Sequence, residues 1–431
     1  MKANQSLLSI IVFSLLFGTR AFPLQAADEF EQPPIEYSSS EPDNVVSRFQ
    51  ATLNRGELSL DYDSKFGYLP ALLKQWGVPV ESQTLVFSKT SLQRSRISPR
   101  TPRALYFNDS VYIGYCHLGD VLEISVADPA LGTVFYTLDQ DVEKPPLFVR
   151  QTDQCLQCHG ASHTAHVPGH TVRSLFVDAG GMPLLSEGSH RVNQTTPIEK
   201  RWGGWYVTGT HGSQKHMGNL IVRNRLAEQP WIVEKDQNVT DLTDRLAVKN
   251  YLSPHSDLIA LLVLEHQTFV HNLLVNANFT ARQALHYEQT INKAFGDSLD
   301  RRLESTARRI ASAGEKLVQG LFFVDEAPLE GPYAGTSGYA EVFTSLGKRD
   351  AQGRSLRDFD LRTRLFKYPC SYLVQTPEFE ALPPLMKDYV SHRIQEVLQG
   401  TAGEDYQHLT AEDRQAITEI LQATTNLLPR K

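Results

Sequence analysis

Residues 105–138 read LYFNDSVYIGYCHLGDVLEISVADPALGTVFYTL, and this stretch decides the fold of the half of the chain in which it lies. Its first two apolar runs, 105–107 and 111–113, flank the polar triplet Asn108-Asp109-Ser110. A second pair, 121–126 and 133–138, flanks the turn sequence DPALG. Short runs rich in β-branched and aromatic residues on either side of such turns are typical of β-hairpins. The stretch therefore predicts two consecutive hairpins.

Further strands are predicted on both sides of these hairpins. The run Leu85-Val86-Phe87 precedes them, and residues 172–177 follow them and lead into the turn sequence DAGG. We therefore expect a β-rich region over residues 81–230.

From about residue 250 onward the pattern becomes helical. The sequence SPHSD at 253–257 supplies helix-capping side chains directly before an apolar run. One helical face then carries Ile259, Leu262, His266, Phe269 and Leu273. We expect helix to continue over 280–320 and to recur near 383–399 and 410–427. The fold class is therefore predicted as α+β, with a β-rich N-terminal half and a helical C-terminal half over residues 231–431.

The N-terminus predicts an exported protein. Lys2 precedes an apolar run from Leu7 to Phe17, and small residues follow, which is the pattern of a secretory signal peptide over residues 1–26, cleaved after Ala26 or Ala27. An uncleaved anchor is the alternative. The next segment, 27–80, is predicted as a linker and N-terminal segment, with a flexible tether up to about residue 48 because it is rich in Pro and Ser. No later stretch approaches transmembrane length, so we expect no membrane span after cleavage and a periplasmic or secreted location.

The charge balance excludes some partners. The 431-residue chain has a formal net charge of −7, which argues against nucleic acid and anionic membrane surfaces as partners. Nothing in the composition indicates an oligomeric state.

The motif with the clearest chemistry is Cys155-Leu156-Gln157-Cys158-His159. Two thiols at this spacing can each add to one haem vinyl group, and the adjacent histidine can then bind the iron, so the motif predicts one covalent haem c. A zinc site would need a second ligand pair at similar spacing, and a thioredoxin-like dithiol would need a βαβ context. Export favours haem c over both alternatives.

The other two cysteines, Cys116 and Cys370, form an even pair. In an oxidising compartment they could join in a disulfide, and the alternative is two buried free thiols. The sequence leaves both open.

The second axial ligand of the iron decides between electron transfer and catalysis, because a Met or His there closes the iron to small molecules. Our first candidates are Met217 and His216, followed by His266 and then His211. The wider set of candidates comprises Met182, His163, His166, His170 and His271. Of these, His163 and His166 are expected to be too close to His159 in sequence to reach the opposite haem face.

Two other groups of residues could line a pocket. We favour plain core packing for Trp202, Trp205 and Tyr206. The polar stripe Glu265, Thr268, Asn272 and Asn276 on the predicted helix is expected to be a water-exposed edge.

Several motifs give the chain a resemblance to a known group. They are CLQCHG at 155–160, WGGWYVTGTHG at 202–212, QKHMGN at 214–219, LEHQ at 264–267 with His271-Asn272, and YPCSY at 368–372. With them the chain resembles large exported bacterial proteins that carry a cytochrome c domain, over residues from about 85 to 400. The resemblance implies a haem c and export, and it leaves the activity open.

Two functions follow as hypotheses. The first is an electron carrier with a closed iron that serves a redox partner protein. The second is a haem oxidoreductase, peroxidase-like, that takes a small-molecule oxidant at an open iron and uses Glu265 or His266 as acid–base help. The length of the chain favours the second, because simple carriers are usually smaller, but we take electron transfer as the main hypothesis. A redox or ligand sensor that docks onto a partner is a third possibility.

Overall fold

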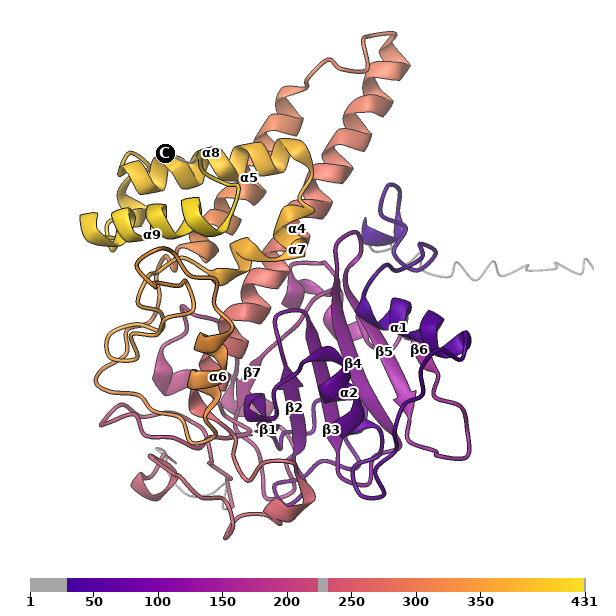
Figure 1. Ribbon diagram of the computed structural model, residues 1–431, viewed down its shortest axis with the longest axis vertical. Helices are drawn as coiled ribbons and strands as arrows, with labels where there is room; N and C mark the ends of the chain where they lie inside the picture. The colour runs from indigo at the N-terminus through magenta and orange to yellow at the C-terminus, as the bar shows by residue number, and fades with distance from the viewer. Residues whose placement is uncertain (1–28, 224–231, 430–431) are drawn as a thin grey trace, which may run out of the picture.

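The computed structural model describes residues 29–223 and 232–429. The predicted signal peptide, residues 1–26, lies outside the described residues. Within them an antiparallel sheet occupies the N-terminal half and helices dominate the C-terminal half, as Figure 1 shows. The mixed α and β architecture predicted from the sequence is confirmed at this level.

The main sheet has seven strands within the described residues, in the order β6-β5-β4-β3-β2-β1-β9, and every neighbouring pair is antiparallel. The predicted hairpins are its centre, as β2–β3 and β4–β5. A small sheet pairs β7 with β8. The strands are β1 (Thr84–Val86), β2 (Arg103–Phe107), β3 (Val111–Cys116), β4 (Val121–Asp128), β5 (Gly132–Asp139), β6 (Phe148–Arg150), β7 (Arg173–Leu175), β8 (Ser189–Arg191) and β9 (Trp205–Tyr206).

The register of the sheet gives each face a different role. Phe107, Tyr112, Ser125 and Phe135 are paired in sequence across β2 to β5, so they form one row on one face. Phe107 and Tyr112 of this row pack in the same apolar cluster as the long helix α4 (Leu258–Phe295). The neighbouring row, on the opposite face, packs in a second cluster with α1 (Val45–Asn54) and α2 (Leu69–Trp76). The sheet is therefore covered on both faces.

The expected flexible tether is wrong for the described residues from 29 onward. Phe30, Ile35 and Tyr37 are at most 1% exposed. The Tyr37 hydroxyl donates a hydrogen bond to the Thr133 carbonyl on β5 at 2.8 Å. Three buried side chains on either side of Pro33 and Pro34 therefore anchor the segment, although its average composition is polar.

Helix α4 begins where the sequence predicts. The Asp257 carboxylate accepts hydrogen bonds from the backbone N–H groups of Ile259 (2.8 Å) and Ala260 (3.1 Å), so it caps the helix. The helix ends at Gly296, whose φ of +71° is the left-handed conformation that favours glycine. This stop divides the helix predicted over 280–320 into α4 and α5 (Glu304–Leu321).

The last two predicted helices are confirmed as α8 (Pro384–Gln399) and α9 (Ala411–Thr424). Two short helices, α6 (Tyr339–Ser345) and α7 (Pro377–Glu380), lie in otherwise irregular chain between α5 and α8. In Figure 1 the α4–α5 hairpin projects beyond the body, and α8 and α9 pack beside its base.

By length and composition α4 could cross a membrane, contrary to the expectation that no later stretch approaches that length. However, 78% of its most apolar 18-residue window is buried inside the protein. Burial of this kind is the arrangement of a core helix in a globular protein.

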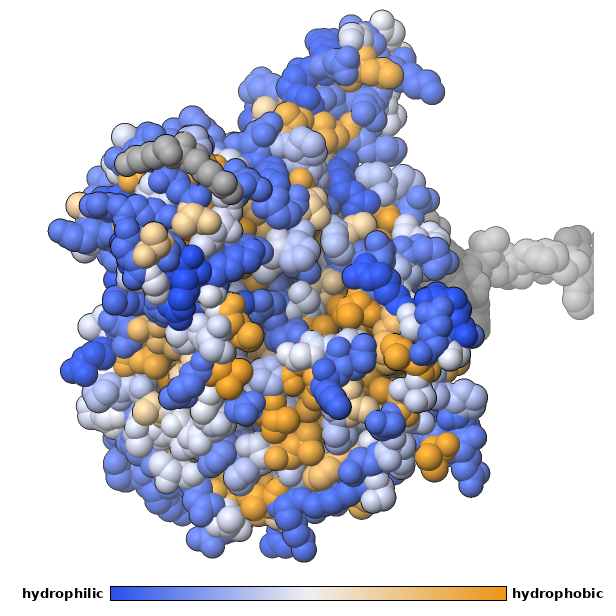
Figure 2. Space-filling model, in the orientation of Figure 1, coloured by the Kyte–Doolittle hydropathy of each residue, from blue (hydrophilic) through white to orange (hydrophobic). Residues whose placement is uncertain are grey.

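Most of the face drawn in Figure 2 is hydrophilic, with apolar patches among the polar groups. One apolar patch lies at the tip of the projecting hairpin. The exposed apolar residues of that segment include Tyr287, Phe295 and Leu299.

Candidate functional site

The CxxCH motif forms a single helical turn, α3 (Leu156–His159), a short loop after the edge strand β6. The backbone N–H groups of Cys158 and His159 both donate to the Cys155 carbonyl, at 3.2 and 2.9 Å. Residues three and four positions apart share one face of a helix, so both thiols and the imidazole lie on the same side of the turn. Leu156 is buried and anchors the turn, whereas Cys158 is exposed and Cys155 is half-buried.

One ring nitrogen of His159 is engaged in a hydrogen bond. Its Nδ1 lies 2.9 Å from the Gly169 carbonyl oxygen, and the Gly169 N–H donates back to the His159 carbonyl at 2.8 Å. A carbonyl can only accept, so Nδ1 carries the proton. Burial lowers the pKa of His159, which favours the neutral ring. A neutral imidazole protonated at Nδ1 presents its Nε2 lone pair as a possible metal ligand.

The ring of His159 packs against Phe135, with ring centroids 5.0 Å apart. Phe135 also contacts His170, whose ring lies 4.2 Å from that of Tyr112. His170 Nε2 is hydrogen-bonded to the Ser125 hydroxyl at 2.8 Å. The row of side chains on the sheet therefore forms a floor beneath the CxxCH turn and the loop that follows it.

A buried polar network joins this floor to α4. Gln267 Nε2 donates to the Asn108 carbonyl (2.8 Å) and to the Tyr112 hydroxyl (2.6 Å), and the carbonyl fixes the orientation of the amide. The Tyr112 hydroxyl is also hydrogen-bonded to His271 Nδ1, 3.2 Å away. On the other side, the Tyr372 hydroxyl donates to Gln267 Oε1 at 2.5 Å. Within this network, every side chain except His271 has its polar atoms hydrogen-bonded to a neighbour.

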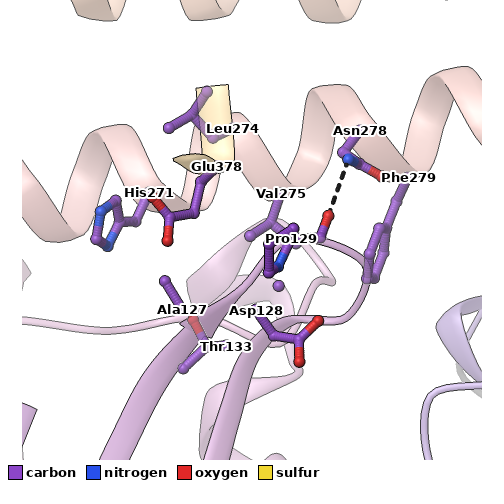
Figure 3. A pocket seen from close by; sticks show the side chains of 11 residues that line it. Ala127, Asp128, Pro129, Thr133, His271, Leu274, Val275, Asn278, Phe279 and Glu378 are labelled. Carbon is purple, nitrogen blue, oxygen red and sulfur yellow. Dashed lines mark hydrogen bonds between the residues drawn. The ribbon is translucent and has the colours of Figure 1, made fainter. Parts of the chain in front are cut away.

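A small pocket lies between α4 and the β4–β5 turn, with His271 and Glu378 among its lining residues (Figure 3). Neither His271 Nε2 nor Glu378 Oε2 has a hydrogen-bond partner in the part of the chain that the structure describes. The pocket has room for roughly one water molecule, which could satisfy both atoms. It is too small for an organic cofactor.

Met217 and His216, the first candidates for the second iron ligand, make contacts with other residues than those around His159. The Met217 sulfur accepts a hydrogen bond from the Ser174 hydroxyl at 3.6 Å, and His216 Nδ1 accepts one from the Gly218 N–H at 2.9 Å. The contacts of His159 come instead from Phe135 and Gly169. The assignment of Met217 or His216 as the second iron ligand stays a prediction.

His266 has both ring nitrogens engaged. Nδ1 lies 2.6 Å from Gln194 Oε1 and Nε2 lies 2.8 Å from the Ser371 hydroxyl. Burial lowers its pKa to about 3, so the ring is neutral. To bind iron, His266 would have to give up one of these buried hydrogen bonds.

The stripe expected to be a water-exposed edge is buried at its start. Glu265 is 0% exposed, and its carboxylate forms an ion pair with the Arg201 guanidinium at 2.8 Å. Burial raises the pKa of Glu265, and Arg201 acts against this shift. Thr268 is also buried. The aromatic residues Trp202, Trp205 and Tyr206 are buried as well, in agreement with the core packing we favoured.

The surroundings of the cysteines and of other potential ligands bear on the alternatives to haem c. Burial raises the pKa of the Cys155 thiol to about 11, which opposes the reactive thiolate that a dithiol redox enzyme needs. Within residues 29–223 and 232–429, no group of three or more His, Cys, Asp or Glu side chains could hold a metal ion. Cys116 and Cys370 are buried free thiols, so the disulfide alternative is not realised in the described chain.

No protein-family model, curated protein or solved structure matches this chain. The resemblance to cytochrome c domain proteins therefore stays a prediction.

Proposed function

We propose that the chain is an exported c-type cytochrome that carries one covalent haem and transfers electrons. The observation that supports this function best is the CxxCH turn itself. The turn presents both thiols and the imidazole on one face. His159 Nδ1 donates a hydrogen bond to the Gly169 carbonyl, so Nε2 remains free to bind iron.

Haem attachment requires no oxidant at this site. Cys155 and Cys158 would each hold the porphyrin through one thioether bond, in which the thiol sulfur is bonded to one vinyl carbon and the thiol hydrogen has passed to the other. The exposure of Cys158 leaves its sulfur accessible for this reaction. A bound haem supplies an iron centre that accepts and returns one electron.

The competing function is a peroxidase-like oxidoreductase with an open iron. Its proposed acid–base residues both have other partners. Glu265 forms an ion pair with Arg201, and His266 is hydrogen-bonded to Gln194 and Ser371. A general acid or base must reach the reacting group. These contacts favour electron transfer over that alternative.

The test is spectroscopic. The full chain is expressed in a bacterial host that has a cytochrome c maturation system, and the purified protein is analysed by the pyridine haemochrome method. We expect one covalent haem per chain. Cys155→Ala and Cys158→Ala should each lose one thioether bond, and Cys370→Ala is the matched control because its thiol is buried far along the chain.

The same samples decide between the two functions. A ferrous spectrum that is low-spin and unaffected by carbon monoxide means a closed iron and electron transfer. Ready binding of carbon monoxide means an open iron and replaces this proposal with the oxidoreductase. A wild-type chain without covalent haem, produced by a host that matures a control cytochrome, contradicts both.

A further inference from the structure

The loop that holds His159 is itself held by helix α4. The Asn272 side chain accepts a hydrogen bond from the His170 N–H through Oδ1 at 2.9 Å, and it donates one to the His170 carbonyl through Nδ2 at 2.7 Å. Both partners are backbone groups with fixed roles, so the orientation of the amide is fixed as well. The side chain pairs with this residue as a neighbouring β-strand would.

Gly169 makes this close approach possible. A Cβ atom built on Gly169 would lie 2.2 Å from Asn272 Oδ1, so any side chain there would displace the amide. The Gly169 backbone also exchanges two hydrogen bonds with His159, one of them from the ring Nδ1. The segment Gly169-His170 therefore lies between the imidazole on one side and Asn272 on the other.

Asn272 and His170 are separated by 102 residues in sequence. Asn272 is placed by α4, a helix of 38 residues whose flanks are buried in both apolar clusters. The loop after the CxxCH turn has only short stretches of regular structure, such as the 3-10 turn Ser162–Thr164. The rigid partner in this contact is therefore the helix.

We propose that Asn272 is a positioning residue for the axial histidine: by clamping the His170 backbone it fixes the Gly169 carbonyl that accepts the hydrogen bond from His159 Nδ1–H. This inference rests on the proposed haem site. A well-aligned Nδ1–H···O bond makes an imidazole a more electron-rich ligand, which stabilises the ferric state and lowers the reduction potential. The helical half thereby sets the potential of a site that lies in the β-rich half.

The test compares Asn272→Ala with Asn276→Ala in the full-length protein with its haem attached. Asn276 lies one turn further along α4 and is also half-buried. Potentiometric titration should show a more positive midpoint for Asn272→Ala. A rise of up to about 60 mV corresponds to a tenfold change in the relative stability of the two oxidation states. Asn276→Ala should keep the wild-type potential.

Gly169→Ala provides an independent approach to the same contact. Its methyl group would displace the Asn272 amide, so we expect a similar rise in potential. The double variant Gly169→Ala/Asn272→Ala should be no worse than the more affected single variant, because both changes remove one interaction. A second readout is NMR of the ferrous protein, in which the His159 Nδ1 proton should exchange faster with solvent in Asn272→Ala.

Each outcome has one meaning. An unchanged potential and unchanged proton exchange in Asn272→Ala overturn the proposal, and so does an equal shift in Asn276→Ala, which would indicate a general disturbance of the helix. If Asn272→Ala does not fold, Asn272→Ser gives the same comparison with a shorter polar side chain. Absence of haem from the wild-type protein is a failure of the proposed function, and the haemochrome assay detects it separately.

Discussion

The surroundings of His159 and His266 show how the fold holds one residue type in two different ways. His159 uses one ring nitrogen for a backbone carbonyl, and it lies beside the exposed Cys158. His266 uses both nitrogens for side chains, and its ring stacks on Phe323 with centroids 4.3 Å apart. A histidine with a free nitrogen is available to a metal, whereas one with two buried partners stabilises the fold.

The two regions also differ in the charged groups that they contain. Near His266 a buried ion pair joins Arg201 to Glu265, and the guanidinium also donates to the carbonyls of Gln194 and Thr196. At the CxxCH turn the functional groups are two thiols and a neutral imidazole. We therefore expect changes near His266 to alter stability and changes at the turn to alter attachment of the proposed haem.

The largest expected effect comes from breaking the ion pair near His266. Arg201→Met leaves the buried Glu265 carboxylate unpaired and should lower the free energy of unfolding by about 3–5 kcal/mol. Urea denaturation measures the loss, and the haem content per folded chain should not change. Arg308→Met is the control, because its ion pair with Glu304 is exposed and should be worth less than about 1 kcal/mol. Equal losses in the two variants would remove the distinction between the regions.

The second effect concerns His271, which lies between the regions. Burial lowers its pKa to about 4 from an unfolded value of 6.5. Between these two values the unfolded chain binds a proton that the folded chain does not, so stability falls as the pH falls through this range. From pH 7 to pH 5 the wild type should lose about 2 kcal/mol more than His271→Gln.

Urea denaturation at the two pH values gives this difference. His163→Gln serves as the control, because His163 is exposed. Identical pH dependence in the wild type and His271→Gln would mean that His271 finds a partner for its charged form.

A smaller effect is expected at Tyr372, which hydrogen-bonds to Gln267 of α4 from outside the helix. Tyr372→Phe removes the hydroxyl that donates to Gln267 Oε1 and preserves the ring, so it should cost about 1 kcal/mol. Thermal unfolding measures this change, and Tyr287→Phe on the exposed hairpin should have no effect. A neutral Tyr372→Phe would indicate that water replaces the lost donor.

The smallest effect concerns the question of whether a disulfide joins the two halves. Cys116 lies in the β-rich half and Cys370 in the helical half, and both are free. A thiol reductant should therefore leave the midpoint of unfolding unchanged. A loss of about 2–4 kcal/mol on reduction, the usual value of a disulfide, would show that the two cysteines pair in solution.

The elements that follow from local patterns could be predicted from the sequence. The hairpins around Asn108 and Pro129 and the start of α4 at Asp257 depend on residues within a few positions of one another. The α4–α5 break also has a local cause, Gly296, but the helical periodicity on either side concealed it.

The features that depend on distant residues could not be predicted. Tyr37 reads as part of a polar linker until Thr133 is placed beside it, and Glu265 reads as an exposed carboxylate until Arg201 is placed beside it. The role of Asn272 depends on a contact across 102 residues. Sequence periodicity assigned Asn272 to a polar stripe, but it contains no information on the loop that approaches it.

Helix α4 has a consequence for how the molecule unfolds. At 1.5 Å per residue its 38 residues span about 57 Å, and they belong to both apolar clusters, with Leu258 and Leu274 in one and Val275 and Phe279 in the other. Disorder in either cluster would expose part of α4, so the helix couples the two clusters. We therefore expect the two halves to unfold together, and the amide protons at the centre of α4 to be the slowest in the molecule to exchange with deuterium.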